Sequence, residues 1–215
     1  MGFSVLLDIV GSIIIGGVLL NILWRVNEAT VANTYENSGE LSLQQNLSTV
    51  AMIIENDFRK IGYCSNWTKI PDPAKSIILA DSTKIKFLTD VQSDGVVDTM
   101  YYYLGPASEL TVTQNPRDRV LYRVINSQTP VASNLGVTQF SIIYFNSGGD
   151  TILFPITQPG EVSTMEINVT VENTFRSMAD EGDVGYKGNY SGADEEYLYA
   201  FWRQIRLVAR NLKNR

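Results

Sequence analysis

The chain has 215 residues, 44% of them hydrophobic and 19% charged, so it can hold one folded domain of ordinary size and is neither disordered nor a multi-span membrane protein. Its net charge of −6 creates no overall field that would draw it to nucleic acid or to anionic lipid. A single cysteine rules out an intrachain disulfide, and the lack of histidine excludes imidazole-dependent triads and the commonest zinc ligand, so we do not expect an enzyme.

Residues 1–24 predict a hydrophobic helix. The stretch 3–24 has 22 residues, about 33 Å as an α-helix, which matches the roughly 30 Å hydrocarbon core of a bilayer. A cleaved secretory signal fits poorly, because no Lys or Arg precedes Arg25. A buried core helix also fits poorly, because residues 13–20 are apolar on all sides. We therefore interpret this segment as a membrane helix.

Residues 25–62 predict an amphipathic continuation of the same helix. Apolar residues recur there every three or four positions, as one buried helix face requires: Leu43, Leu47, Val50, Ile54, Phe58 and Ile61. Gly62 follows as the expected helix stop. A near-continuous helix from Phe3 to Ile61 would be about 88 Å long, with any bend expected at residues 37–39. Half of it would lie in lipid and half would carry a domain.

Residues 63–215 predict an antiparallel, β-rich globular head. Short segments rich in β-branched and aromatic residues lie between Gly, Pro, Asn and Asp, at residues 76–80, 83–90, 99–105, 119–126, 138–146, 151–156 and 164–173. Residues 178–197 combine several glycines with six acidic residues, which predicts a mobile loop. Residues 197–212 fit a helix or a strand, and we favour the strand. The predicted fold class is α+β, a long N-terminal helix packed on an antiparallel sheet.

Five short motifs follow one another along the chain. They are Asp57-Phe58-Arg59-Lys60-Ile61-Gly62-Tyr63, Asp94-Gly95-Val96-Val97-Asp98-Thr99-Met100-Tyr101-Tyr102, Leu121-Tyr122-Arg123, Gly136-Val137-Thr138-Gln139-Phe140 before Ile143-Tyr144-Phe145, and Ala209-Arg210-Asn211-Leu212. With the apolar leading helix, this layout resembles the type IV pilins and the type II secretion pseudopilins. The closer likeness is to their minor subunits, of the W type in pili and the J type in secretion. The resemblance implies a pilin-like fold and a structural subunit of a filament.

The resemblance also implies roles for the first residues. In that family a membrane peptidase cuts after a glycine and methylates the new N-terminus, which assigns these roles to Gly2 and Phe3. The family's glutamate at the fifth mature position falls on Leu7 here, and Asp8 is the nearest acid. The implied partners are other pilin or pseudopilin subunits, an inner-membrane assembly platform and a prepilin peptidase. The implied location is the inner membrane with the head outside the cytoplasm, then the periplasm or cell surface in an assembled filament.

Asp8 lies in the segment that we interpret as a membrane helix. A carboxylate in hydrocarbon costs roughly 2.5–3.5 kcal/mol unless a cation meets it. In pilus-like filaments the acid near the start of one helix can meet the N-terminal ammonium of a neighbour, and Ser12 and Gly16, four residues apart, suit such close helix packing. The alternative is an interfacial Asp8 that reaches the lipid headgroups without a protein partner.

The sequence DVQSDGVVD has spacing similar to that of a calcium-binding loop. Its candidate ligands are Asp90, Gln92, Asp94, Val96 and Asp98. Position 12 of such a loop should be a bidentate Glu and is Tyr101 here. An ordinary Asp-Gly hairpin turn accounts for the same residues without a metal. We expect no other cofactor.

Two other functions stay open at the level of sequence. The first is a single-pass, membrane-anchored binding module or adhesin that uses its head for a ligand. The second is a DNA-uptake (competence) pilus subunit, for which the C-terminal cations would supply the contact: Arg203, Arg206, Arg210, Lys213 and Arg215. A strand edge protected against aggregation explains these cations equally well, and nucleic-acid binding is not our expectation. The Tyr101-Tyr102-Tyr103 run predicts sheet packing rather than a ligand platform.

Overall fold

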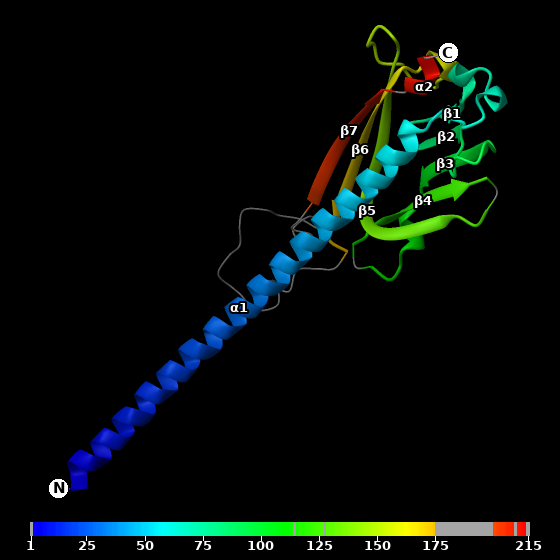
Figure 1. The fold of residues 1–215 in the computed structure, drawn as a ribbon. Coiled ribbons are helices and arrows are strands. Elements are labelled where there is room, and N and C mark those ends of the chain that lie inside the picture. Colours follow the sequence, from blue (N-terminus) through cyan, green and yellow to red (C-terminus); the bar gives the residue numbers. More distant parts are fainter. Residues whose placement is uncertain (1, 114, 127, 175–199, 209, 214–215) are drawn as a thin grey trace.

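A long helix projects from a β-sheet head (Figure 1). The computed structural model describes residues 2–113, 115–126, 128–174, 200–208 and 210–213. The α-helices and strands are α1 (Gly2–Arg59), β1 (Ile77–Ala80), β2 (Lys84–Thr89), β3 (Asp98–Leu104), β4 (Arg119–Ile125), β5 (Val131–Phe145), β6 (Thr164–Glu172), β7 (Ala200–Val208) and α2 (Arg210–Lys213). The described loops also hold short 3₁₀ turns, η1 (Trp67–Lys69), η2 (Pro73–Lys75), η3 (Ala107–Glu109) and η4 (Pro159–Glu161).

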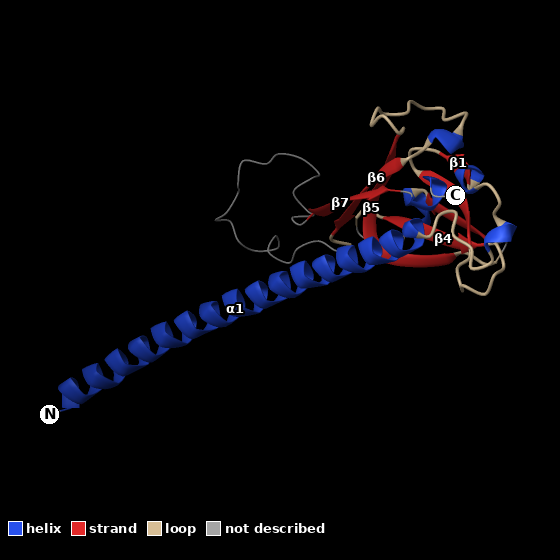
Figure 2. Ribbon diagram, turned by 45° about the horizontal axis from the view of Figure 1, so that its top comes forward, coloured by secondary structure: helices blue, strands red, loops and turns tan. Residues whose placement is uncertain are grey.

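Helix α1 has 58 residues and is unbroken, as Figure 2 shows. The sequence has no proline before Pro71, so every helical N–H in this region can donate. The helix passes through residues 37–39 without a break, and the prediction of one long helix is confirmed. It ends at Arg59, two residues before Ile61, and Gly62 follows with φ +73°. Only glycine adopts this conformation without a steric penalty, which accounts for the stop.

The described strands form one antiparallel sheet of seven strands in the order β1-β2-β3-β4-β5-β6-β7. The 15-residue β5 joins its two parts, because its first half pairs with β4 and its second half with β6. Gly136, with φ +72°, lies where the two pairings meet. The sheet curls, since the N–H of Ile142 on β5 donates to the carbonyl of Ser82 at 2.8 Å, in the turn between β1 and β2. The head is therefore a curved sheet whose concave face receives α1.

The structure corrects two of the predicted strands and confirms a third. Residues 151–156 do not form a strand, since Thr151 makes one isolated bridge to Phe145 and the rest is loop containing Pro155. Strand β5 begins at Val131, well before the predicted residue 138. The strand interpretation of residues 197–212 is confirmed for 200–208 by β7, which pairs with β6 over its whole length, whereas residues 210–212 belong to the short helix α2. The predicted loop at 178–197 lies outside the described residues.

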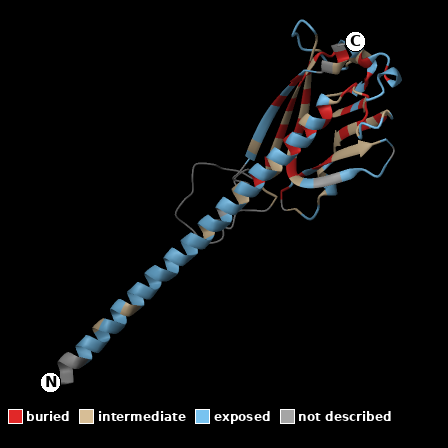
Figure 3. Cartoon of the chain, viewed as in Figure 1, coloured by how far each residue is buried: buried red, intermediate tan, exposed pale blue. Residues whose placement is uncertain are grey.

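The predicted apolar face of α1 forms one wall of the core (Figure 3). Leu43, Val50, Ile54 and Phe58 are all at most 4% exposed, and Leu47 is partly buried beside them. The Phe58 ring makes edge contacts with two aromatic rings of the sheet, with both centroid distances at 5.4 Å. Burial of each such side chain contributes about 1.5–3 kcal/mol. The helix thus belongs to the fold of the head and is not an appendage to it.

The other half of α1 lies outside the head. Its large apolar side chains are mostly exposed, and the head comes close at Gly39, where an added Cβ would lie 3.8 Å from Nδ2 of Asn173. We call residues 25–38 the stem. The stem separates the apolar segment 3–24 from the head.

Candidate functional site

The N-terminal half of α1 exposes a continuous apolar surface. Ile13, Ile14 and Ile15 point in directions 100° apart around the helix, and each is 61–68% exposed. Among the described residues this is the one helix that is long and apolar enough to cross a membrane, and none of its apolar window is buried. Soluble proteins rarely expose a contiguous apolar surface of this extent. The surface therefore requires lipid or other protein around it.

Asp8, Ser12 and Gly16 lie on this surface, within α1, and Gly2 and Phe3 form its first two positions. Asp8 is exposed and has no cation partner among the residues that the structure describes. The Ser12 hydroxyl donates to the Asp8 carbonyl at 2.7 Å, so it is satisfied within its own helix. The structure therefore leaves the Asp8 carboxylate, and not Ser12, as the polar group that needs an outside partner.

Three glycines lower the surface of this half-helix on different sides. A Cβ placed on Gly11, Gly16 or Gly17 would meet nothing within 4 Å, so the chain's own packing does not require glycine there. Glycine in a helix interior is about 1 kcal/mol less favourable than alanine. Small residues let a second helix approach closely. These glycines thus fit a helix–helix contact that a single chain does not contain.

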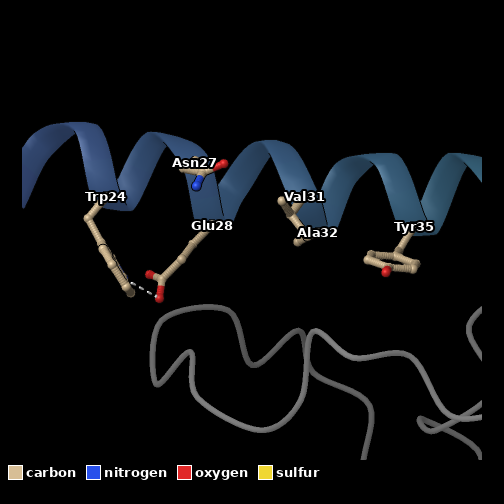
Figure 4. Close-up of a pocket in the computed structure, with 6 residues that line it drawn as sticks. All are labelled: Trp24, Asn27, Glu28, Val31, Ala32 and Tyr35. Carbon is tan, nitrogen blue, oxygen red and sulfur yellow. Dashed lines mark hydrogen bonds between the residues drawn. The ribbon is translucent and has the colours of Figure 1, made fainter.

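A cavity of about 250 Å³ lies along α1 at the base of the stem (Figure 4). Its described lining residues are Trp24, Asn27, Glu28, Val31, Ala32 and Tyr35. The Trp24 indole N–H donates to Oε1 of Glu28 at 2.7 Å. Tryptophan and tyrosine favour the boundary between membrane and water, with the apolar ring inside and the polar group hydrated. This arrangement fits a membrane boundary close to Trp24.

The loop proposed for calcium is organised around Asp90. Its carboxylate is buried and accepts the backbone N–H groups of Ser65, Asp94 and Gly95 at 2.9–3.0 Å. Asp98 is also buried, and its two oxygens accept from Val91 N at 3.1 Å and from Asn126 Nδ2 at 2.8 Å. The oxygens that would bind a cation are thus engaged by N–H donors.

The remaining candidate ligands point to the same interpretation. Gln92 and Val96 are exposed, and Asp94 Oδ1 accepts the N–H of Val96 at 2.8 Å. Within the described ranges no three acidic, cysteine or histidine side chains form a group able to hold a metal. Gly95 has φ +84°, as a tight Asp-Gly turn requires. The contacts support the turn, and the calcium site stays a prediction.

Asp90 should make the stability of the head sensitive to acid. Burial opposes its charge, but the backbone N–H groups of Ser65, Gly95 and Asp94 outweigh burial and hold its pKa below the usual range. A group with a lowered folded pKa stabilises the protein above its unfolded pKa, about 3.9, and that contribution is lost as pH falls further. We expect the melting temperature of wild type to fall steeply between about pH 5 and 3, and that of Asp90→Asn to be lower at pH 7 but flatter with pH.

The same melting experiment decides between the turn and calcium. We expect millimolar Ca²⁺ and chelator to give equal melting temperatures, because Asp90 and Asp98 already have N–H donors. A ligand that binds only the native state raises the melting temperature by mass action. A calcium-dependent rise that Asp94→Ala abolishes would contradict the turn interpretation and establish the metal site.

A buried polar cluster joins the last turn of α1 to the sheet. We call Asp57, Tyr102 and Arg123 the Asp57 cluster. The Tyr102 hydroxyl donates to Oδ2 of Asp57 at 2.5 Å, and Nε of Arg123 lies 2.6 Å from the same oxygen. The Asp57 side chain is 6% exposed and that of Arg123 25%. Tyr102 on β3 and Arg123 on β4 are direct cross-strand partners. The cluster ties the helix to two central strands.

The electrostatics of the cluster keep the Tyr102 hydroxyl protonated and Arg123 charged, as their hydrogen bonds to Asp57 require. Burial, with the neighbouring Asp57 carboxylate, raises the pKa of Tyr102 far above its usual range, so its hydroxyl remains a donor. Burial opposes the charge of Arg123, but its interactions with Asp57 and Tyr102 together outweigh burial and its pKa rises. All three residues occur in motifs that carried the family resemblance, although their meeting was not predicted.

The tyrosines next to Tyr102 form a packed ladder on the outer face of the sheet. The ring centroids of Tyr101 and Tyr103 are 4.9 Å apart, and those of Tyr103 and Tyr122 are 4.8 Å apart. A Cβ on Gly105 would lie 2.8 Å from the Tyr122 ring, so the backbone covers that end. The geometry favours sheet packing, as the sequence analysis expects.

Of the C-terminal cations, Arg203 and Arg206 lie on the strand β7, Arg210 and Lys213 lie in the short helix α2, and Arg215 is outside the described residues. Arg203 and Arg206 are exposed and point to opposite faces of the sheet, because they pair with Val169 and Glu166 of β6, three residues apart. The Arg206 guanidinium lies 5.1 Å from the centroid of the Phe145 ring. These described cations do not form one basic surface, so they give little support to DNA binding.

Comparison with known proteins gives one distant likeness. No family model matches the chain, and no curated protein matches it. Among solved structures it is similar to a type IV-like pilin from Thermus thermophilus, with a TM-score of 0.45 and 10% sequence identity over 80% of this chain and 97% of that one. A likeness this distant does not establish a family. The fold, a long helix followed by an antiparallel seven-stranded sheet, is defined by the helices and strands of this chain and does not depend on the comparison.

Proposed function

We propose that the chain is a structural subunit of a type IV pilus-like or type II secretion-like filament, inserted in the membrane and assembled through the N-terminal half of α1. The observation that carries the proposal is the apolar half-helix, which is exposed on all sides and is not buried by any described residue of the head. A helix that served one soluble partner would need a single apolar face. This helix needs a lipid or protein environment on every side.

Three features of the same half-helix support assembly beyond simple anchoring. The Asp8 carboxylate has no cation partner among the described residues, and it lies where a membrane penalises charge. The glycines at 11, 16 and 17 serve no packing within the chain. The head is built around the other half of α1, so the helix cannot move without the head. All three features are accounted for if the helix of a neighbouring subunit packs closely against this half-helix and brings a cation near Asp8.

The finer identity of the subunit belongs to the same proposal. The motif resemblance supports a minor subunit of the W or J type, with cleavage after Gly2 and methylation at Phe3 by a prepilin peptidase. Its partners would be other pilin or pseudopilin subunits and an inner-membrane assembly platform. The head would face away from the cytoplasm, in the periplasm or at the cell surface. The role is structural and not enzymatic, in keeping with a chain that has no histidine.

Replacement of Asp8 tests the proposal. Asp8→Ala and Asp8→Asn should insert and fold normally, because removal of a charge makes the lone helix easier to insert. Their incorporation into filaments should fall by about 100-fold or more, because loss of one partner of a buried ion pair typically costs about 3–5 kcal/mol. The assay compares membrane protein with sheared, filament-associated protein in cells that carry the assembly machinery. Asn21→Ala, at another exposed polar residue of the same half-helix, is the matched control.

Two outcomes would contradict the proposal. Equal incorporation of wild type, Asp8→Ala and Asp8→Asn would mean that Asp8 is an interfacial residue without a protein partner. Mass spectrometry of the purified N-terminus gives the second test: an N-methylated Phe3 is expected, whereas an intact Met1 on all of the protein would favour an anchored binding module or adhesin.

A further inference from the structure

The apolar face of α1 does not by itself fix how the helix sits on the sheet. Its buried side chains are all apolar and recur at one-turn intervals, so a slide of one turn, about 5.4 Å, puts Ile54 near the place of Phe58 and Val50 near that of Ile54. Apolar burial is non-directional and depends mainly on area. Such a shifted packing would keep much of the buried surface.

The Asp57 cluster has the directionality that this face lacks. One carboxylate oxygen receives Tyr102 Oη and Arg123 Nε, and Arg123 Nε also lies 3.1 Å from Tyr102 Oη. A shift of α1 by one turn, or a rotation by one residue, would bury the Asp57 charge away from both partners. The two strand residues are held in place by their cross-strand pairing. The contacts of the cluster therefore form in one position of the helix.

A second polar contact acts at the same end of α1. Asn211 Nδ2 donates to the carbonyls of Arg59 and Ile61, at 3.3 and 3.2 Å, where the helix leaves its last carbonyl groups without internal partners. Cys64 is the one cysteine of the chain, so no intrachain disulfide can hold the helix on the head. The buried apolar face therefore holds α1 on the head, and its polar contacts add direction: those close to the end of α1, and Asn46, whose Nδ2 donates to the Leu135 carbonyl at 3.3 Å.

We propose that the Asp57 cluster is a register lock, which sets the axial and rotational position of α1 on the head. Successive helix residues differ by 100° in direction, so a rotation by one residue would turn Asp8 by that angle relative to the head. The lock thus fixes which side of the head faces the same way as Asp8. This inference extends the proposed function, because identical subunits can repeat a contact only if helix and head keep one relation. It does not depend on that function, since the lock lies within one chain.

Spin-label distances in the full chain, in detergent micelles, test the lock. Labels go on Asn33→Cys in the stem and Lys86→Cys on β2, both exposed positions, whereas the native Cys64 is buried. Double electron–electron resonance should give one narrow distance distribution for the otherwise wild-type chain. Asp57→Leu, Tyr102→Phe and Arg123→Met together remove the cluster but keep apolar volume. This triple variant should show a broad distribution or a second distance shifted by about 5 Å.

The melting temperature separates a lock from a merely stabilising contact. Replacement of a buried ion pair by apolar groups of similar volume is often neutral or stabilising. We therefore expect the triple variant to melt within a few degrees of wild type while its distances change. Arg117→Met is the control, because it removes an ion pair to Glu172 that does not include α1. It should leave the distances unchanged.

An unchanged, narrow distribution in a folded triple variant would overturn the inference. If the triple variant fails to fold, Arg123→Lys decides, because lysine keeps the charge but cannot place one N–H against both Asp57 and Tyr102. A broadened distribution would then support the lock, and the wild-type distribution would overturn it. None of these results depends on Asp8 or on filaments, so the inference and the proposed function can fail separately.

Discussion

A chain shortened to begin at Ser42 should give a soluble, monomeric head, whereas one that begins at Ser65 should aggregate. The shorter deletion removes the exposed half of α1 and keeps its buried face. The longer deletion removes Leu43, Val50, Ile54 and Phe58, each worth about 1.5–3 kcal/mol of burial. Their sum is comparable to the whole net stability of a typical domain, about 5–15 kcal/mol.

The longer deletion would also expose the concave face of the sheet and leave Arg123 without Asp57. Size-exclusion chromatography and thermal melting followed by circular dichroism would compare the two proteins. A protein beginning at Ser65 that melts at the same temperature as the one beginning at Ser42 would show that α1 is not part of the core.

Gly136→Ala should be among the most destabilising single changes in the head. Gly136 has φ +72°, and an added Cβ would lie 2.5 Å from the backbone oxygen of Glu172. A backbone atom cannot swing aside, so β5 and β6 would have to separate at the point where the sheet turns. Backbone strain and the forced shift together should cost about 3 kcal/mol, or roughly 10 °C in melting temperature.

Gly149→Ala separates the two contributions to this effect. Gly149 has φ +90°, but a Cβ there would meet nothing within 4 Å. This control should cost about 1–2 kcal/mol, from the left-handed conformation alone. Equal losses for the two variants would mean that the approach of Glu172 to Gly136 is not a close contact in solution.

The helix could be predicted well because its signals are local. A spacing of three and four between apolar residues identifies the buried face, and Gly62 marks the end, whatever the rest of the chain does. The prediction of a strand at residues 151–156 was wrong, because apolar and β-branched residues there are typical of a strand. Pro155 cannot donate to a ladder, and the neighbouring strand edge is used only at Thr151.

The Asp57 cluster and the turn of the sheet could not be predicted in the same way. Asp57 and Arg123 are 66 positions apart, and they meet only because the β3–β4 register places Tyr102 opposite Arg123. One signal was present: an acid in the apolar stripe of α1, and an arginine between the inward-facing Leu121 and Ile125. Buried opposite charges on two elements predict a pair, but not which register forms it.

The length of the stem determines how strongly the surface potential of the membrane acts on the head. If the bilayer ends near Trp24, the 14 residues of the stem raise the described part of the head by about 21 Å. The Debye length at physiological ionic strength is about 8 Å. The surface potential of anionic lipid therefore decays almost completely before it reaches an acidic head with no basic patch to attract it. The orientation of the head should then be insensitive to lipid charge and to salt, and should be dictated by α1 alone.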